Sequence, residues 1–222
     1  MEIMEDTIAA IATAVSEAGI SIVRISGKQA IETATRIFRC GKKDFVLEEQ
    51  PSHTIHYGFI YDGEERVDEV LLLLMKGPHS YTGEDTVEID CHGGVYVTRQ
   101  ILETVIRHGA RLAEPGEFTK LAFLNGRMDL AQAEAVIDVI KAKSEMPLQI
   151  AERQLKGRLG TEISEIRESL RDVLAQMAVN IDFPDEDIEQ VESQRFCEDL
   201  SEVKEKVQNL LDTCDNGRAL CF

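Results

Sequence analysis

Residues 77–94 read GPHSYTGEDTVEIDCHGG, a loop rich in glycine and proline that leads into a short β-branched strand. Side chains on a strand alternate between two faces, so Glu88 and Asp90 share one face while Val87 and Ile89 share the other. The two glycines that follow allow another backbone, or a ligand, to approach closely. Because a carboxylate on a central strand is costly to bury without hydrogen-bond donors, Glu88 either faces water or meets a partner.

Short β-branched runs between turn signals continue on both sides of this stretch. The expected strands cover residues 20–25, 54–61, 67–75 and 86–90, with a turn at Asp62-Gly63 between the second and the third. Helical periodicity is interleaved with them over residues 28–38 and 95–108. Hairpin-linked strands therefore occur beside strands separated by a helix, which predicts an α+β fold with a mixed β-sheet and packed helices.

From Asp129 onward the pattern is helical. Asp129 and Gln132 have the spacing of a capping box, and an alanine-rich run follows to about residue 143. Two long amphipathic stretches, 155–177 and 191–214, lie on either side of Pro184, which cannot continue a helix. We expect them to pack antiparallel, although two or three helices bury little apolar surface unless more chain joins them.

The change from mixed to helical pattern divides the chain into two expected domains, residues 1–120 and residues 121–222. Residues 145–222 carry twice as many acidic as basic side chains, and this step in charge density also indicates a boundary. With 222 residues, 43% hydrophobic and 29% charged, the chain has enough apolar material for two cores.

The overall charge and the cysteines narrow the possible partners and compartments. The formal net charge is −17 and Lys and Arg are not clustered, so an RNA substrate would have to be held by another surface or subunit. Five scattered cysteines without a CxxC pair favour reduced thiols in the cytoplasm and disfavour a structural zinc. No apolar run approaches the ~20 residues that span a bilayer, so no membrane contact is expected. The P-loop pattern GxxxxGK[ST] is also absent, so this chain alone is not expected to hydrolyse a nucleoside triphosphate.

For two arginines, as for Glu88, the sequence leaves open whether the charged side chain is structural or part of a binding site. Arg24 lies on an apolar strand, on the face of Ile20 and Ile22, where it forms either a structural salt bridge or part of a site. Arg127 follows the turn at Asn125-Gly126 and, by pattern alone, is a loop arginine.

Two other clusters are weaker candidates. Cys91 and His92 suggest a nucleophile with its base, or metal ligands, but adjacent strand residues point to opposite faces. The acidic cluster Asp182, Asp185, Glu186 and Asp187 lacks the ligand spacing and the turn glycine of a calcium loop. We therefore assign neither a catalytic residue nor a metal site.

Taken together, the ordered motifs resemble the MnmE/TrmE family of tRNA-modification GTPases over nearly the whole chain. The motifs are Asp6-Thr-Ile-Ala-Ala10, Ile22-Val-Arg-Ile-Ser-Gly27, Gly77 to Asp85, Cys91-His-Gly-Gly94, Glu114-Pro-Gly-Glu-Phe-Thr119, Ala122-Phe-Leu-Asn125, Asp129 to Ala135 and Ile181 to Glu186. The resemblance implies a domain related to the tetrahydrofolate-binding domain of the glycine-cleavage T protein. In the MnmE/TrmE family this domain is expected to homodimerise and to bind 5-formyltetrahydrofolate. The resemblance also implies a helical domain into which a potassium-dependent GTPase domain, binding GTP and Mg²⁺, is inserted; after residue 220 the family continues into that domain, whereas this sequence ends at Phe222.

The same resemblance implies that the folate contacts are Arg24, Glu88 and Arg127. Some members of the family have lysine at the position of Arg127, a change that keeps the charge but alters the donor geometry. The full-length family protein works with the FAD protein MnmG to add an aminomethyl-type group, such as carboxymethylaminomethyl, to the wobble uridine of tRNA. Two other functions stay open, a free-standing tetrahydrofolate-dependent aminomethyltransferase and an assembly module without a ligand.

Overall fold

The computed structural model describes residues 6–41, 44–182 and 193–218. The chain divides into two compact units, Met1–Met128 and Asp129–Phe222. The expected boundary after residue 120 falls within helix α3 (Glu117–Leu124), which belongs to the first unit.

A seven-stranded sheet in the order β3-β4-β5-β6-β2-β1-β7 forms the first unit. Its strands are β1 (Ile8–Ile11), β2 (Ile20–Ser26), β3 (Phe38–Arg39), β4 (Thr54–Asp62), β5 (Glu65–Met75), β6 (Thr86–His92) and β7 (Arg111–Leu112). Every neighbouring pair is antiparallel except β1 and β7, which are parallel, so the predicted mixed sheet and α+β class are confirmed. The strands β1, β3 and β7, of four, two and two residues, are too short to show an alternating pattern in the sequence.

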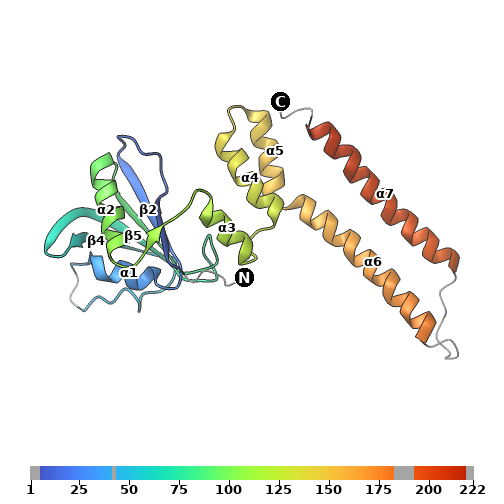
Figure 1. Cartoon of the computed structure of the whole chain (residues 1–222), viewed down its shortest axis with the longest axis horizontal. Helices are drawn as coiled ribbons and strands as arrows, with labels where there is room; N and C mark the ends of the chain where they lie inside the picture. The colour runs from blue at the N-terminus through green and yellow to red at the C-terminus, as the bar shows by residue number, and fades with distance from the viewer. Residues whose placement is uncertain (1–5, 42–43, 183–192, 219–222) are drawn as a thin grey trace. The chain divides into compact units, whose positions relative to one another are not determined.

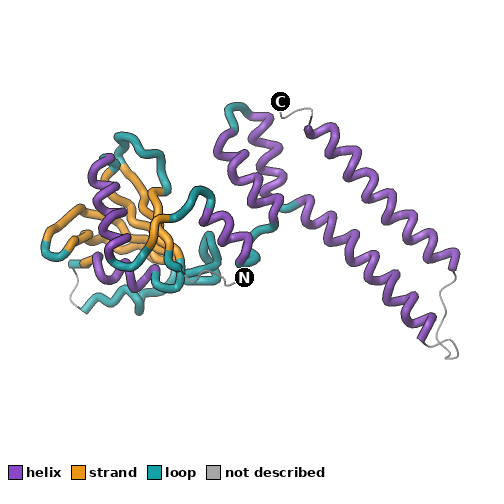
Figure 2. The backbone as a smooth tube through the Cα atoms, viewed as in Figure 1, coloured by secondary structure: helices purple, strands orange, loops and turns teal. Residues whose placement is uncertain are grey.

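Helices α1 (Ala30–Ile37) and α2 (Val95–Arg107) pack on one face of this sheet (Figure 1, Figure 2). The fully buried side chains between the two layers include Val23, Ile25, Leu72, Val87, Ile89, Ile101 and Val105. Alternation along β2 and β6 therefore places Arg24 and Glu88 on the opposite face of the sheet. On that face Ile20, Tyr57 and Leu71 are exposed.

The second unit is helical, as predicted, and contains α4 (Leu130–Lys141), α5 (Glu145–Leu155), α6 (Arg158–Asp182) and α7 (Ser193–Arg218). Helices α6 and α7 run side by side and antiparallel (Figure 1). Val173 and Val203 are buried between them, but Leu174, Ile181 and Leu211 are exposed. The pair therefore leaves much of its apolar surface open to water. None of the helices, over the residues described, is both long and apolar enough to cross a membrane.

The predicted capping box begins α4. The side chain of Asp129 accepts a hydrogen bond from the backbone N–H of Gln132 at 2.8 Å, and the backbone N–H of Asp129 donates to Gln132 Oε1 at 2.9 Å. Gln132 also donates through Nε2 to the carbonyl oxygen of Leu155, at the end of α5. The cap thus ties the start of α4 to its neighbouring helix.

We expect Asp129→Ala to destabilise the helical unit by about 1 kcal/mol. The backbone N–H of Gln132 loses its acceptor, and the reciprocal bond from the backbone N–H of residue 129 to Gln132 is weakened. Urea unfolding followed by circular dichroism at 222 nm measures this loss. Asp138→Ala removes an exposed carboxylate from the middle of the same helix and should change the midpoint little. Equal midpoints for the two variants would contradict a stabilising cap.

Candidate functional site

Arg24 and Glu88 meet on the face of the sheet opposite α1 and α2. The register of the antiparallel strands β2 and β6 places the two residues directly opposite one another. Arg24 Nε donates a hydrogen bond to Glu88 Oε1 at 2.7 Å. The two side chains are 25% and 15% exposed, so the ion pair is largely shielded but still reachable from solvent.

This pair keeps hydrogen-bonding capacity that the protein does not use. The two terminal NH2 groups of Arg24 make no hydrogen bond to any residue that the structure describes, and neither does Glu88 Oε2. A guanidinium and a carboxylate side by side can serve a ligand that has both acceptors and donors on one edge. The arrangement is thus a salt bridge that still has atoms available for a ligand.

Two aromatic rings contact the Arg24 guanidinium. Its central carbon, Cζ, lies 5.2 Å from the ring centroid of Tyr81 and 5.5 Å from that of Phe118, within the range of cation–π attraction. Tyr81 belongs to the loop before β6, and Phe118 is in the first turn of α3. The hydroxyl groups of Tyr81 and Thr119 are hydrogen-bonded at 2.9 Å, which joins the loop to the helix.

Arg127 holds the same loop from the other end of α3. Its Nε donates to the carbonyl oxygen of Ser80 at 3.0 Å, and Asn125 Nδ2 donates to the carbonyl oxygen of Thr82 at 2.8 Å. Gly83, at φ +82°, lets the loop pass close to the Arg127 side chain, since a Cβ there would lie 3.2 Å from Arg127 Cγ. The terminal NH2 groups of Arg127 make no hydrogen bond to the residues described.

Buried hydroxyl groups fix the loop to the sheet. Ser26 Oγ on β2 and Thr82 Oγ1 are 2.6 Å apart, and both lie close to Thr86 Oγ1 at the start of β6. Ser80 and Tyr81 are adjacent, so a two-residue segment of this loop contacts Arg127 through one residue and Arg24 through the other. Arg24 and Arg127 therefore both contact this loop, and Glu88 is in direct contact with Arg24.

No local sequence pattern distinguishes Tyr81, Phe118 or Thr119 as part of the site. All three lie inside the motifs 77–85 and 114–119, but the contact between these motifs is tertiary. A ring next to a glycine-rich loop was the only available signal.

Comparisons with known proteins agree with this architecture. A family model described as the GTP-binding protein TrmE N-terminus matches residues 7–127, and one described as the MnmE helical domain matches residues 130–221. The chain is 51% identical over 219 residues to the tRNA modification GTPase MnmE of Clostridioides difficile (strain 630), covering 98% of this chain and 47% of the relative. It is 50% identical over 218 residues to the MnmE of Enterococcus faecalis (strain ATCC 700802 / V583), covering 97% of this chain and 46% of the relative.

The chain belongs to the MnmE family of tRNA modification GTPases. It spans about half the length of the curated relatives it matches. The two family matches meet between residues 127 and 130, where the structure also divides into its two units. All three candidate residues of this MnmE-family chain, Arg24, Glu88 and Arg127, lie in the first unit.

Cys91 and His92 lie on opposite faces of the sheet, as their adjacency on a strand predicts. Cys91 is buried on the face of the sheet that α1 and α2 cover, where its thiol donates to the carbonyl oxygen of Ser21 and burial raises its pKa. The His92 side chain is 70% exposed and its Nδ1 is 2.8 Å from Asp68 Oδ1, a hydrogen bond that raises the pKa of the imidazole. Side chains on opposite faces do not have the geometry of a nucleophile and its base.

Two carboxylates near the site are poorly compensated. Glu84 Oε2 and Asp90 Oδ1 are buried without a hydrogen-bond partner among the residues described. Burial raises the pKa of both, and the neighbouring Glu88 raises the pKa of Asp90 further. Asp90 also lines a shallow hollow of ≈ 230 Å³ on the face of the sheet opposite α1 and α2, beside Ile20, Tyr57 and Leu71.

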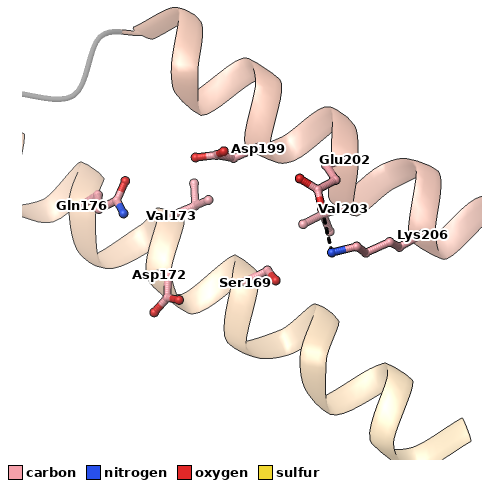
Figure 3. Close-up of a pocket in the computed structure, with 8 residues that line it drawn as sticks. All are labelled: Ser169, Asp172, Val173, Gln176, Asp199, Glu202, Val203 and Lys206. Atoms are coloured by element: carbon pink, nitrogen blue, oxygen red, sulfur yellow. Dashed lines mark ion pairs between the residues drawn. The ribbon is translucent and has the colours of Figure 1, made fainter.

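A second pocket, of ≈ 220 Å³, lies between α6 and α7 in the helical unit (Figure 3). It is lined by Ser169, Asp172, Val173 and Gln176 of α6 and by Asp199, Glu202, Val203 and Lys206 of α7. Lys206 Nζ lies 2.8 Å from Glu202 Oε1 of its own helix, and this ion pair is the dashed line in Figure 3. Three carboxylates against one lysine make this pocket unsuited to an anionic ligand such as a folate.

The acidic cluster around Pro184 was not predicted to bind a metal ion. Asp185, Glu186 and Asp187 lie outside the described residues, and so does the side chain of Asp182. Over residues 6–41, 44–182 and 193–218, no group of three or more His, Cys, Asp and Glu side chains is placed to hold a metal ion.

Proposed function

We propose that this chain binds a one-carbon folate, 5-formyltetrahydrofolate or a related derivative, at Arg24, Glu88 and Arg127. The observation that carries the proposal is the Arg24–Glu88 pair, which is largely shielded from water and still has NH2 groups and a carboxylate oxygen available. Arg127 supports the proposal because its Nε donates a hydrogen bond to Ser80, in the loop whose Tyr81 ring lies against Arg24.

The chemistry of a pterin suits these groups. A pterin presents a ring N–H next to an exocyclic amine, and one carboxylate can accept both hydrogen bonds with its two oxygens. Each carboxylate oxygen has two lone pairs, so Glu88 can bind the pterin and keep its hydrogen bond from Arg24 Nε. The terminal NH2 groups of Arg24 and Arg127 suit the carbonyl, formyl or carboxylate oxygens of the folate.

We infer a wider role from the family. The relatives are named tRNA modification GTPases, and the proposed activity of the whole protein is to modify the wobble uridine of tRNA, together with MnmG, in the cytoplasm. GTP, K⁺ and Mg²⁺ would be bound by a GTPase domain and not by the residues of this chain. The net charge of −17 supports a division of labour in which tRNA is held elsewhere.

Homodimerisation through the first unit is part of the proposal. Its sheet has one face covered by α1 and α2, whereas the other exposes Ile20, Tyr57 and Leu71 around a shallow hollow. Apolar side chains gathered on an uncovered sheet face are typical of an interface with another protein surface. Sedimentation velocity on the 222-residue chain tests this directly, and a monomer at micromolar concentration would contradict it.

Calorimetric titration with 5-formyltetrahydrofolate tests the site. Glu88→Ala is expected to weaken binding about 100-fold, because a carboxylate that accepts two hydrogen bonds is lost at a cost of about 3 kcal/mol. Glu88→Gln should also bind the folate more weakly than the parent chain, since its amide presents an N–H donor where the pterin also has donors. Glu103→Ala, which removes an exposed carboxylate from α2, is the matched control and should bind like the parent chain.

The outcomes separate the three candidate functions. Equal binding by Glu88→Ala and the parent would refute the assigned site. A dimeric parent chain that gives no heat with any folate would favour an assembly module. Transfer of a one-carbon unit by the isolated chain would instead favour an aminomethyltransferase.

A further inference from the structure

Arg24 is held by more contacts than its ion pair requires. Its Nε is bonded to Glu88, and two rings from separate segments, Tyr81 and Phe118, lie against its guanidinium. An arginine side chain has several rotatable bonds, so a site that needs one orientation of its terminal NH2 groups must restrict them. The hydrogen bond fixes one nitrogen, and the rings restrict the rotation that remains.

Phe118 is itself positioned by contacts that do not involve Arg24. The neighbouring Glu117 accepts two hydrogen bonds from Arg111, at 2.6 and 3.0 Å, and a third from the backbone N–H of Glu114 at 2.7 Å. These bonds fix the first turn of α3 against β7. The ring of Phe118 is therefore presented to Arg24 by an independently anchored helix.

Tyr81 is positioned in a similar way from the loop. Its hydroxyl is hydrogen-bonded to Thr119, and the carbonyl groups of its two neighbours, Ser80 and Thr82, accept hydrogen bonds from Arg127 and Asn125. The two rings therefore belong to one connected unit of loop and helix.

We propose that Phe118 and Tyr81 are positioning residues, which orient the Arg24 guanidinium so that its free NH2 groups meet the oxygen atoms of a bound folate. The ligand part of this inference rests on the folate function proposed above. Both rings also keep water from the guanidinium, and hydrogen bonds from a shielded cation to an oxygen acceptor are stronger than those from a solvated one. Phe118 acts through Arg24 and needs no contact with the ligand.

The first test is titration of the whole chain with 5-formyltetrahydrofolate. Phe118→Leu is expected to raise Kd about tenfold, since it keeps an apolar side chain on α3 but removes the ring. Phe118→Tyr keeps the ring and should restore binding to within about twofold of the parent. Phe123→Leu makes the same substitution on the same helix at a side chain that is 39% exposed, and should leave Kd unchanged.

A second test needs no ligand. The Nε–H group of Arg24 gives a nitrogen–proton NMR signal, identified by its loss in Arg24→Lys. We expect this signal to be displaced by the two rings and to exchange slowly with water. Phe118→Leu should move it toward the position of a free arginine and speed its exchange, while the amide signals of α3 stay in place.

The two readouts distinguish failure of this inference from failure of the folate proposal. If the parent and Phe123→Leu bind the folate and Phe118→Leu binds equally well, the positioning role is overturned and the folate site stands. If no variant binds folate, the proposed function fails. The positioning of Arg24 then depends on the NMR signal, and an unchanged Nε–H signal in Phe118→Leu overturns it.

Discussion

Gly93→Ala is expected to lower the free energy of unfolding of the first unit by about 3 kcal/mol, the upper part of the usual range for overpacking. A Cβ on Gly93 would press on the carbonyl group of Ala18, lying 2.5 Å from its carbon atom. The backbone N–H of Ala18 also donates to the carbonyl oxygen of Gly93, at 3.0 Å. The two segments therefore cannot separate to admit a methyl group without losing this hydrogen bond.

Urea unfolding of the whole chain, followed by tyrosine fluorescence, measures the effect, because all four tyrosines lie in the first unit. Gly19→Ala is the matched control, since it lies next to Ala18 and a Cβ there meets no heavy atom within 4 Å. This control should change stability by less than about 0.5 kcal/mol. A Gly93→Ala chain as stable as the control would show that the loop and the end of β6 adjust freely.

The long elements of this chain could be predicted because their patterns are local. Helix α2 and the strands β4, β5 and β6 lie within two residues of their expected bounds, and the capping box at Asp129 was read correctly. Helix α3 was not predicted as a helix. Its eight residues are too few for a clear period, and the bonds from Arg111 to Glu117 that anchor it join residues whose contact the sequence does not show.

The residues of the candidate site could be proposed from the sequence, but the geometry that joins them could not. Strand alternation predicted which neighbours share a face with Glu88 and with Arg24, but not whether that face contacts water or another part of the protein. Only the pairing of β2 with β6, across 64 residues, brings them together. The rings around Arg24 depend on a loop and a helix meeting in space, which no local pattern encodes.

Glu117→Gln is expected to destabilise the first unit by about 2 kcal/mol at neutral pH, the range for hydrogen bonds to charged groups. Hydrogen bonding from Arg111 is the main cause that lowers the pKa of Glu117 from its ordinary value of 4.5, and it raises the pKa of Arg111. The Glu117 side chain is only 9% exposed, so solvent screens the pair weakly. The amide side chain of this variant would keep the shape of the carboxylate but could accept hydrogen bonds through one oxygen only.

The pH dependence identifies the charge as the cause. A carboxyl group with a lowered pKa stabilises the folded state above its unfolded pKa, and this contribution is lost as the pH falls through the folded pKa. The difference between the parent and Glu117→Gln should therefore be full at pH 7 and shrink below pH 4.5, where the carboxyl group takes up a proton in the unfolded chain while Glu117 of the folded chain is still ionised. Glu84 and Asp90 have raised pKa values and act in the opposite sense, but they are present in both proteins and cancel in the difference. Urea unfolding of both chains from about pH 3 to pH 7 measures the difference in their free energies of unfolding. A difference that is independent of pH would show that Glu117 holds α3 by packing rather than by charge.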